Sequence, residues 1–398
     1  MLRSIAVVGG GVAGLMTALR LAHAGNRVTL FESDLIGSGA SLDNHGFIHS
    51  GALYAEIHPE VTAPLRAAGA LFQKTFPSAV TRKSTWYVTD SHRLNALCNL
   101  WEQQQIPFHH LESSDLDGIV HPVARLYQGV EVPELNVSTR SVLLSLTRLC
   151  VSMGVEIRVN CPVVRIRWAS RNRVDLVFGS AQTMTFDTVV LANGAGIAPL
   201  LRAAGCRSAA RIKARLCTMV AVSNAGLVQP IVWHQKGGLS VAPVTDDVLL
   251  VSLFGGEQRP VNETRKWSVP VSNVNSIVDR LISLLHPSTY SLENWRAYTS
   301  VKVEYAAGFA DAGGGEPNFA VIDHECDDSI PNLWTLIPGK FSLAFHASRS
   351  ASERILDSDL ELTLPVTAGA ESHNLECLVT YPAWMLTISS AETTPEAA

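Results

Sequence analysis

The strongest constraint in this chain is a glycine-rich turn between a strand-like run and a helix-like run near the N-terminus. Ser4–Val8 is a short apolar run that predicts a buried strand. Apolar residues then recur at helical spacing until Gly25 and Asn26, and a second apolar run follows at Val28–Phe31. Ser4–Phe31 therefore predicts a strand–turn–helix–strand unit, which implies a parallel sheet with a right-handed crossover.

The turn itself has the spacing of a dinucleotide site. Gly9, Gly11 and Gly14 form GxGxxG, and Glu32 closes the second strand 23 residues after Gly9. Gly9 permits the tight turn, Gly11 lets a pyrophosphate approach the backbone, and Gly14 lets helix and strand pack closely. The helix N-terminus adds free N–H groups. Glu32 can bond a ribose diol, which fits FAD or NAD and disfavours the 2′-phosphate of NADP. A purely structural glycine turn is the alternative.

The rest of the chain alternates between extended and helical patterns. The glycine- and serine-rich stretch Gly37–Gly51 predicts a functional loop. Closely spaced strands at Met219–Val222, Gly238–Ala242 and Val248–Ser252 predict an antiparallel sheet. Further helices are predicted at Val61–Phe76, Val137–Met153, Asn273–Leu285 and Phe341–Leu356, and further strands at Ser84–Thr89, Val155–Val159, Val163–Trp168, Arg173–Phe178, Met184–Phe186, Thr188–Leu191 and Leu333–Ile337.

Composition and missing motifs exclude several classes of protein. The seven cysteines are odd in number and none has CxxC spacing, which argues against a disulfide framework or a zinc site, so no metal is expected. The net charge of −5 argues against a nucleic-acid partner. No run reaches the ~20 apolar residues of a membrane span, and no signal-peptide pattern is visible. We therefore expect a cytoplasmic protein, with a homo-oligomer left open. Hydrolase and phosphoryl-transfer motifs are lacking.

A late apolar segment, Leu375–Ile388, is too short to cross a bilayer and contains Pro382. It predicts a strand or a packing arm. A contact with a membrane surface or a second subunit is the alternative, and the lack of a basic face weakens the membrane version.

Three stretches together resemble one enzyme family. Gly37–Tyr54 reads GSGASLDNHGFIHSGALY and resembles the loop after the second strand in the D-amino-acid-oxidase-like superfamily of FAD enzymes. The closest branch is that of L-2-hydroxyglutarate oxidase and glycerol-3-phosphate dehydrogenase. Asp187–Gly196 resembles the second FAD motif, and Asn332–Ile355 the closing strand–turn–helix. Asp43 departs from the basic residue that this branch often carries, and Trp295–Tyr305 lacks an arginine–proline pattern of many relatives.

The resemblance implies an α/β fold. A Rossmann-like FAD-binding domain is expected to carry an inserted α+β substrate domain with a mainly antiparallel sheet. The FAD-binding domain would be discontinuous, made of residues 1–80, 137–215 and 325–360. The substrate domain would take residues 81–136 and 216–324, and residues 361–398 would form a C-terminal extension.

FAD is the cofactor that the resemblance implies. The backbone of Val163 would meet the adenine, Asn193 and Gly194 would lie near the pyrophosphate, and the helix after Lys340 would point its N-terminus at the flavin ring. The full set of residues expected to bind FAD is Gly9, Gly11, Val12, Ala13, Gly14, Glu32, Ser33, Ser41, Asn44, His45, Gly46, Val163, Asn193, Gly194, Gly339, Lys340, Phe341 and Ser342.

The superfamily oxidises a C–H bond beside an oxygen or nitrogen, with hydride passing to flavin N5. His49 is the candidate base because histidine titrates near neutral pH, and His45 is the alternative. Lys340 would add positive charge beside the flavin, unless it is an ordinary solvated lysine. Arg296 first and Lys302 second are candidates for holding a substrate carboxylate or phosphate. Hydroxyl donors could be Tyr54, Tyr298 and Tyr305, for which core or rim positions are the ordinary alternative.

The expected activity is that of an FAD-dependent oxidase or dehydrogenase acting on the CH–OH carbon of a small substrate, such as a 2-hydroxy acid. The electron acceptor, oxygen or a quinone, is left open. An amine or amino-acid oxidase acting on a CH–NH donor is the alternative. A non-catalytic flavin-binding subunit is the second alternative, and a nicotinamide dehydrogenase is disfavoured because no second dinucleotide motif is visible.

Overall fold

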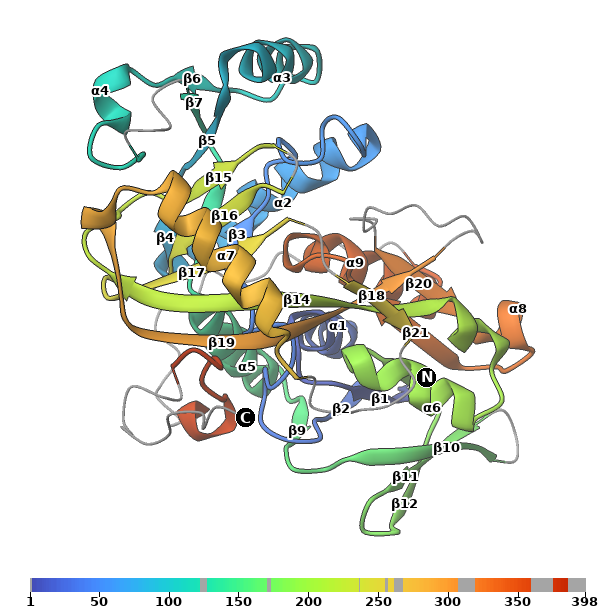
Figure 1. Cartoon of the computed structure of the whole chain (residues 1–398). Helices are drawn as coiled ribbons and strands as arrows, with labels where there is room; N and C mark the ends of the chain where they lie inside the picture. Colours follow the sequence, from blue (N-terminus) through green and yellow to red (C-terminus); the bar gives the residue numbers. More distant parts are fainter. Residues whose placement is uncertain are drawn as a thin grey trace.

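The computed structural model describes residues 2–121, 127–169, 173–235, 237–254, 257–260, 268–306, 319–358 and 375–385, arranged around two large sheets (Figure 1). The helices are α1 Val12–His23, α2 Thr62–Thr75, α3 Ser91–Gln103, α4 Ser113–Leu116, α5 Thr139–Ser152, α6 Ile197–Ala203, α7 Val271–Leu284, α8 His324–Asp328 and α9 Ala344–Leu356.

The strands up to residue 191 are β1 Ser4–Val8, β2 Arg27–Phe31, β3 Phe47–Ile48, β4 Val80–Arg82, β5 Thr85–Asp90, β6 His109–His110, β7 Tyr127–Val132, β8 Leu135–Val137, β9 Glu156–Arg158, β10 Val163–Ala169, β11 Arg173–Phe178, β12 Thr183–Phe186 and β13 Thr188–Leu191. The later strands are β14 Ile212–Asn224, β15 Ile231–Trp233, β16 Leu239–Pro243, β17 Val248–Leu253, β18 Glu257–Pro260, β19 Tyr290–Tyr305, β20 Ala320–Asp323 and β21 Leu333–Ile337.

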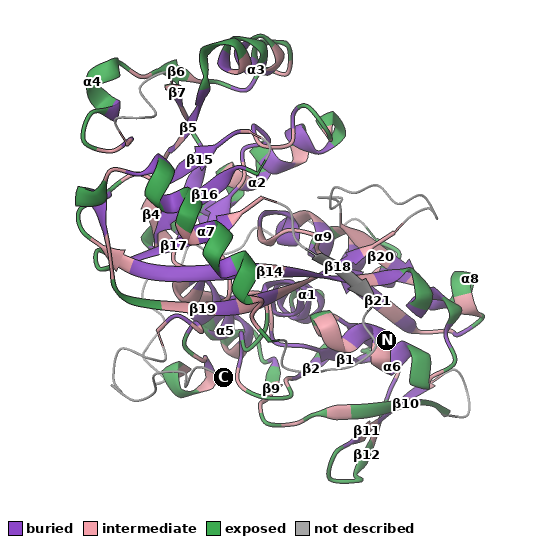
Figure 2. Cartoon of the chain, in the orientation of Figure 1, coloured by how far each residue is buried: buried purple, intermediate pink, exposed green. Residues whose placement is uncertain are grey.

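The first sheet has six strands in the order β20-β21-β13-β1-β2-β9, parallel except for the β20–β21 pair. All five residues of β1 are buried, because the sheet is covered on both faces. Helices α1, α5 and α9 pack together on one face, and the small sheet β10–β12 and α6 cover the other. Figure 2 shows α1 buried along most of its length. The predicted strand–turn–helix–strand unit is confirmed.

The second sheet has nine strands and is mainly antiparallel, with β5 and β15 as a parallel pair. Its buried faces are covered by α7 on one side and α3 on the other. The predicted α/β fold class, with a parallel sheet and a mainly antiparallel second sheet, is confirmed. The numerical domain boundaries given above stay a prediction.

Two long strands connect these layers. β14 pairs with β19 in an antiparallel ladder from Ile212–Tyr305 to Asn224–Tyr290 (Figure 1). Ile212 packs into the core of the parallel sheet, whereas Val220 packs into the core under α7. The sequence patterns predicted only the Met219–Val222 part of β14, and they did not predict α3.

The C-terminal segment 375–385 packs against the chain as an arm. Ile36 donates its N–H to the carbonyl of Leu378 and accepts from the N–H of Thr380, at 2.8 and 3.0 Å. The Trp384 side chain is buried in a cluster with Met219 and Tyr298. The predicted packing arm is therefore confirmed for these residues, and residues 386–388 of the predicted segment lie outside the described residues.

Glycine is required where α1 begins. A Cβ on Gly14 would lie 2.0 Å from the carbonyl oxygen of Gly9. We predict that Gly14→Ala lowers the free energy of unfolding by about 2 kcal/mol or more, because the strand and the helix must separate to admit the methyl group. Urea unfolding of the purified protein measures the change.

The matched control is Gly69→Ala in α2, where an added Cβ meets nothing within 4 Å. This change should raise stability by about 0.5–1 kcal/mol through helix propensity. Equal and small effects of the two substitutions would contradict the assigned role of Gly14.

Candidate functional site

The turn after β1 presents backbone N–H groups to a cavity. Gly9 has a φ of +112° and donates its N–H to the carbonyl of Phe31 at 2.7 Å. Gly11 precedes α1 without a side-chain cap, and the N–H of Val12 donates to Ser41 Oγ at 3.1 Å. A Cβ on Gly11 would lie 2.9 Å from the same Oγ. This helix end therefore has the positive character and the backbone access that a pyrophosphate needs.

Glu32 ends the strand beside this turn. Its Oε2 accepts from the N–H of Gly10 at 2.7 Å, and its Oε1 accepts from Ser33 Oγ at 2.9 Å and from the N–H of Asp34 at 3.2 Å. These bonds hold the carboxylate at the wall of the cavity. The carboxylate is thereby placed next to the phosphate turn, as a ribose-binding acid requires.

The cavity has a volume of about 870 Å³, within the range of cofactor pockets. Its walls come from the turn before α1, the loop of residues 37–45, residues 161–164, residues 192–197, residues 299–303 of β19 and the turn at residues 338–341. The predicted FAD-binding residues that line it are Gly9, Gly11, Val12, Ala13, Glu32, Ser33, Ser41, Asn44, His45, Val163, Asn193, Gly194, Gly339, Lys340 and Phe341. The chemistry and size of this lining fit a dinucleotide.

Four predicted residues do not line the cavity. Gly14 is used in helix–strand packing, and Gly46, with a φ of +77°, lets the backbone pass close to Val137. Ser342 is fully buried, and its hydroxyl accepts from the N–H of His49 at 3.0 Å. Arg296 does not line the cavity itself, although its charge acts on Asp43, which does. Direct substrate contact by Arg296 therefore stays a prediction, and the second candidate, Lys302, is the one that β19 brings to the cavity lining.

The two candidate bases differ in their surroundings. Burial lowers the pKa of His45 to about 3, and the nearby Lys302 and His49 add to the effect. Such a weakly basic imidazole is a poor proton acceptor at neutral pH. His49 also lines the cavity, and its side chain is 16% exposed. The contrast favours His49 over His45 as the base.

The ring of His49 is held from several sides. It stacks on Phe47 with centroids 6.0 Å apart and meets the edge of Tyr54 at 5.3 Å. Its Nδ1 lies 3.5 Å from Oε1 of Glu134, a carboxylate with no exposed surface. Pattern reasoning missed Glu134, because a single glutamate before a short strand carries no motif.

Two positive side chains line the same cavity as His49. Lys302 on β19 and Lys340 in the turn before α9 both line it. The Lys340 ammonium lies 5.2 Å from the centre of the Tyr54 ring, and burial lowers its pKa. Arg215 stands opposite Lys302 in the β14–β19 ladder and forms an ion pair with Glu304 at 3.0 Å. Arg215 and Glu304 were also missed, because no strand was predicted over either residue and their pairing depends on the β14–β19 ladder.

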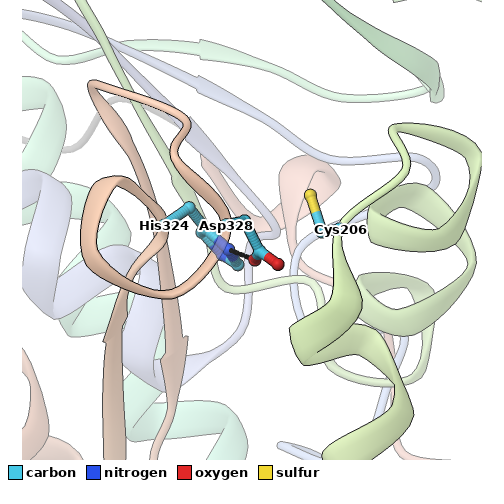
Figure 3. A group of neighbouring side chains, drawn as sticks. All are labelled: Cys206, His324 and Asp328. Carbon is cyan, nitrogen blue, oxygen red and sulfur yellow. Dashed lines mark hydrogen bonds and ion pairs between the residues drawn. The ribbon is translucent and has the colours of Figure 1, made fainter.

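One group of side chains outside the cavity lining has the composition of a metal site. Cys206, His324 and Asp328 place one ligand atom each within 4.8 Å of the others (Figure 3). Nδ1 of His324 lies 2.7 Å from Oδ2 of Asp328, and Nε2 lies 2.9 Å from Thr335 Oγ1. Ser208 also donates to Asp328 at 2.6 Å. Because both ring nitrogens are engaged and burial raises the pKa of Cys206, we interpret the group as a structural hydrogen-bond network.

Asp43 lies at the cavity wall beneath the C-terminal arm. Its Oδ1 accepts from the N–H of Ala383 at 3.1 Å. Burial raises the pKa of this carboxyl to about 6, although the Ala383 bond and the charge of Arg296 oppose the shift. Burial therefore destabilises the ionised form of the Asp43 carboxyl at neutral pH.

Comparison with known proteins gives a family and a fold. A family model described as DAO, FAD dependent oxidoreductase, matches residues 4–335. A probable FAD-dependent oxidoreductase of Pseudomonas aeruginosa is 44% identical over 63 residues, which is 16% of this chain and 16% of that protein. Among the helices of the described residues, none is long and apolar enough to cross a membrane.

Solved structures share the whole fold at low sequence identity. Glycine oxidase from Geobacillus kaustophilus has a TM-score of 0.69 and 17% identity over 93% of this chain and 100% of that one. L-α-glycerophosphate oxidase from Mycoplasma pneumoniae, with FAD bound, has a TM-score of 0.72 and 18% identity over 90% and 95%. Iminodiacetate oxidase from Chelativorans sp. BNC1 has a TM-score of 0.69 and 15% identity over 95% and 99%.

The Asp43 carboxyl gives a pH-dependent prediction. Its pKa rises from 3.8 to about 6 on folding, so its neutral form stabilises the fold below pH 4 and this stabilisation is lost as the pH rises through 6. Asp43→Asn should therefore leave stability at pH 4 nearly unchanged and raise it at pH 7.5, by at most about 3 kcal/mol. Thermal unfolding between pH 4 and 8 measures this difference. The exposed Asp279→Asn is the control and should show no such pH trend; a parallel trend in both variants would contradict the assignment.

Proposed function

Because the chain belongs to the DAO family of FAD-dependent oxidoreductases, we propose that it oxidises the CH–OH carbon of a small anionic donor, with a 2-hydroxy acid as the substrate class. The observation that carries this proposal is that His49, Lys302 and Lys340 line the same cavity and all three lie near Tyr54: His49 and Lys340 contact its ring, and the charge of Lys302 acts on its hydroxyl. A base and two cations at one place suit a hydroxyl group next to a carboxylate.

His49 is proposed to take the proton of the donor hydroxyl. Its Nδ1 faces Glu134 at 3.5 Å, which leaves Nε2 as the ring nitrogen available to a molecule in the cavity. The ring is fixed by Phe47 and Tyr54, so little reorientation is needed before proton transfer. FAD, when bound, supplies the hydride acceptor.

Lys302 is proposed to hold the carboxylate of the donor. It lines the cavity, and its charge is close enough to lower the pKa of the buried His45. Arg215, opposite Lys302 in the ladder, is already paired with Glu304, so its charge is largely compensated. Lys340 lies at the turn before α9, where its charge and the adjoining backbone can favour an anionic form of the bound cofactor.

An amine or amino-acid donor is the alternative for the same site. Its support is that solved relatives with the same fold include amino-acid oxidases, although their identity to this chain is below 20%. A cytoplasmic location stays a prediction, and the oligomeric state and the electron acceptor stay open.

Anaerobic absorbance titration separates these functions. The FAD-loaded protein is mixed with separate pools of 2-hydroxy acids, polyols, amino acids and amines, and the flavin band is followed. Bleaching by 2-hydroxy acids is the expected result. Bleaching by amines or amino acids alone would overturn the CH–OH proposal in favour of the alternative, and a band that no pool bleaches would favour a non-catalytic subunit.

The first prediction for this site concerns the base. His49→Gln should lower the rate constant of flavin reduction by about 10²–10⁴-fold, because proton removal then depends on water. Stopped-flow absorbance under anaerobic conditions measures the rate. FAD content should be unchanged, and a His45→Gln variant with FAD fully bound should retain far more of the rate. A fully active His49→Gln variant would remove His49 from the mechanism.

The second prediction concerns the anion. Lys302→Met should raise the KM for a 2-hydroxy acid by about 10–100-fold, since a charged hydrogen bond contributes about 1.5–3 kcal/mol. For an uncharged alcohol of the same shape, the KM of the Lys302→Met variant should rise much less. Steady-state kinetics with both donors checks the difference, and the exposed Lys74→Met serves as the control. Equal losses for both donors would argue against a carboxylate contact at Lys302.

A further inference from the structure

Glu134 is a carboxylate with no exposed surface, and it is situated between β7 and β8. An unpaired charge at such a depth is very unfavourable, so its neighbours must stabilise it. The N–H and the hydroxyl of Ser50 donate to Oε2 at 2.8 and 3.1 Å, and the Tyr87 hydroxyl lies 3.1 and 3.2 Å from the two oxygens. Its backbone carbonyl accepts from Thr85 Oγ1 at 3.0 Å. The position of the carboxylate is therefore fixed on all sides.

Strand pairing places this carboxylate beside the proposed base. β3 and β8 are antiparallel, with Phe47 opposite Asn136 and Ile48 opposite Leu135. One more step along this register brings His49 opposite Glu134. Their side chains meet there, with Nδ1 of His49 3.5 Å from Oε1 of Glu134. Both residues are thus positioned by the same short ladder.

The imidazole has one buried and one accessible nitrogen. Nδ1 of His49 is buried and makes no hydrogen bond to any described residue, and the Glu134 carboxylate is the acceptor that faces it. The backbone N–H of His49 donates to Ser342 Oγ. This bond fixes the backbone at His49 and so keeps the ring beside Glu134. The partner of one ring nitrogen decides which nitrogen carries the proton. A carboxylate at Nδ1 selects the Nδ1–H tautomer and leaves the lone pair on Nε2.

We propose that Glu134 is a positioning residue for His49, a role that rests on the proposed function of His49 as base. Glu134 holds the Nδ1–H tautomer in the resting protein. When the O–H bond of the donor breaks, the proton forms the new N–H bond at Nε2, and Glu134 stabilises the resulting imidazolium. The oxygen keeps the electron pair of the broken O–H bond and uses it to form the carbonyl, and FAD, when bound, would supply the acceptor for the hydride that the carbon loses. The serine and tyrosine donors keep Glu134 in place throughout.

The first test is kinetic and uses Glu134→Gln, which keeps the size of the side chain and removes its charge. Flavin reduction by the active donor should slow by about 10–100-fold, as is typical when the partner of a functional histidine is lost. The acid limb of the pH–rate profile should move to lower pH, because the imidazolium loses its stabilising charge. Glu134→Asp should recover part of the rate. An unchanged rate and profile in Glu134→Gln would overturn the proposal.

A double-mutant cycle separates positioning from structural damage. Adding Glu134→Gln to the His49→Gln variant should lower the rate constant of flavin reduction only slightly further, because the two residues act as one unit. An equal loss in both backgrounds would show a structural role only and would overturn the proposal. Tyr87→Phe is the matched control: it removes one donor to the same carboxylate but leaves the charge facing His49, so it should keep the pH profile of the unmodified protein.

The second test needs neither turnover nor a folded Glu134 variant. Nitrogen NMR of histidine-labelled protein, with the His49 signals identified by their loss in His49→Gln, reads the tautomer directly. The Nδ1–H form is expected, and an Nε2–H form would overturn the proposal. If no hydroxy acid reduces the flavin but His49 shows the Nδ1–H form, the proposed function fails while the pairing stands. If hydroxy acids do reduce the flavin but His49 shows the Nε2–H form, the proposed function stands and only the role of Glu134 fails.

Discussion

The close approach of helix α1 to the end of strand β1 fixes the frame on which the site is built. At Gly14 there is no room for a side-chain atom, since a Cβ would lie 2.0 Å from the carbonyl of Gly9. α1 can therefore begin directly at the sheet and direct its free N–H groups into the cavity. Helices α5 and α9 pack on α1, so their positions follow from it. The turn at Gly339–Phe341, which lines the cavity, follows in turn from the position of α9.

The reacting end of the cavity depends on buried polar contacts between segments that are far apart in the sequence. The backbone of His49 is held by Ser342, and the backbone of Ser50 is held by Glu134. The ladder of β14 and β19 brings Lys302 to the same place from the antiparallel sheet. Each charged group there has a compensating partner or faces the cavity, as the low polarity of the surroundings requires. The reacting end of the cavity is thus polar, and contacts between distant segments hold it together.

Local sequence patterns predicted the parts of this site that lie within one motif. Residue spacing alone predicted the glycine turn, α1 and the place of Glu32. The resemblance predicted the family, the FAD cofactor and the fold class, and all three are confirmed. His49 was found because the motif contains it. Glu134 could not be found in this way, because its role depends on the pairing of β3 with β8, whose partner residues lie 87 and 89 positions apart in the sequence. Arg296 was preferred over Lys302 from residue type, and the two lie six residues apart on the same face of β19, so the position along the strand decides which of them lines the cavity.

The C-terminal arm has a consequence for how the protein is made. Ile36 is bonded to Leu378 and Thr380, and Asp43 to Ala383, so the loop that walls the cavity is completed by residues more than 300 positions later. Chains fold from the N-terminus during synthesis. The first segments of the cofactor site are therefore among the earliest to leave the ribosome, yet their loop gains these backbone partners only once the arm has been translated. A chain that stops before residue 375 would leave this loop without its final backbone partners, so the wall of the cavity depends on one of the last segments to be made.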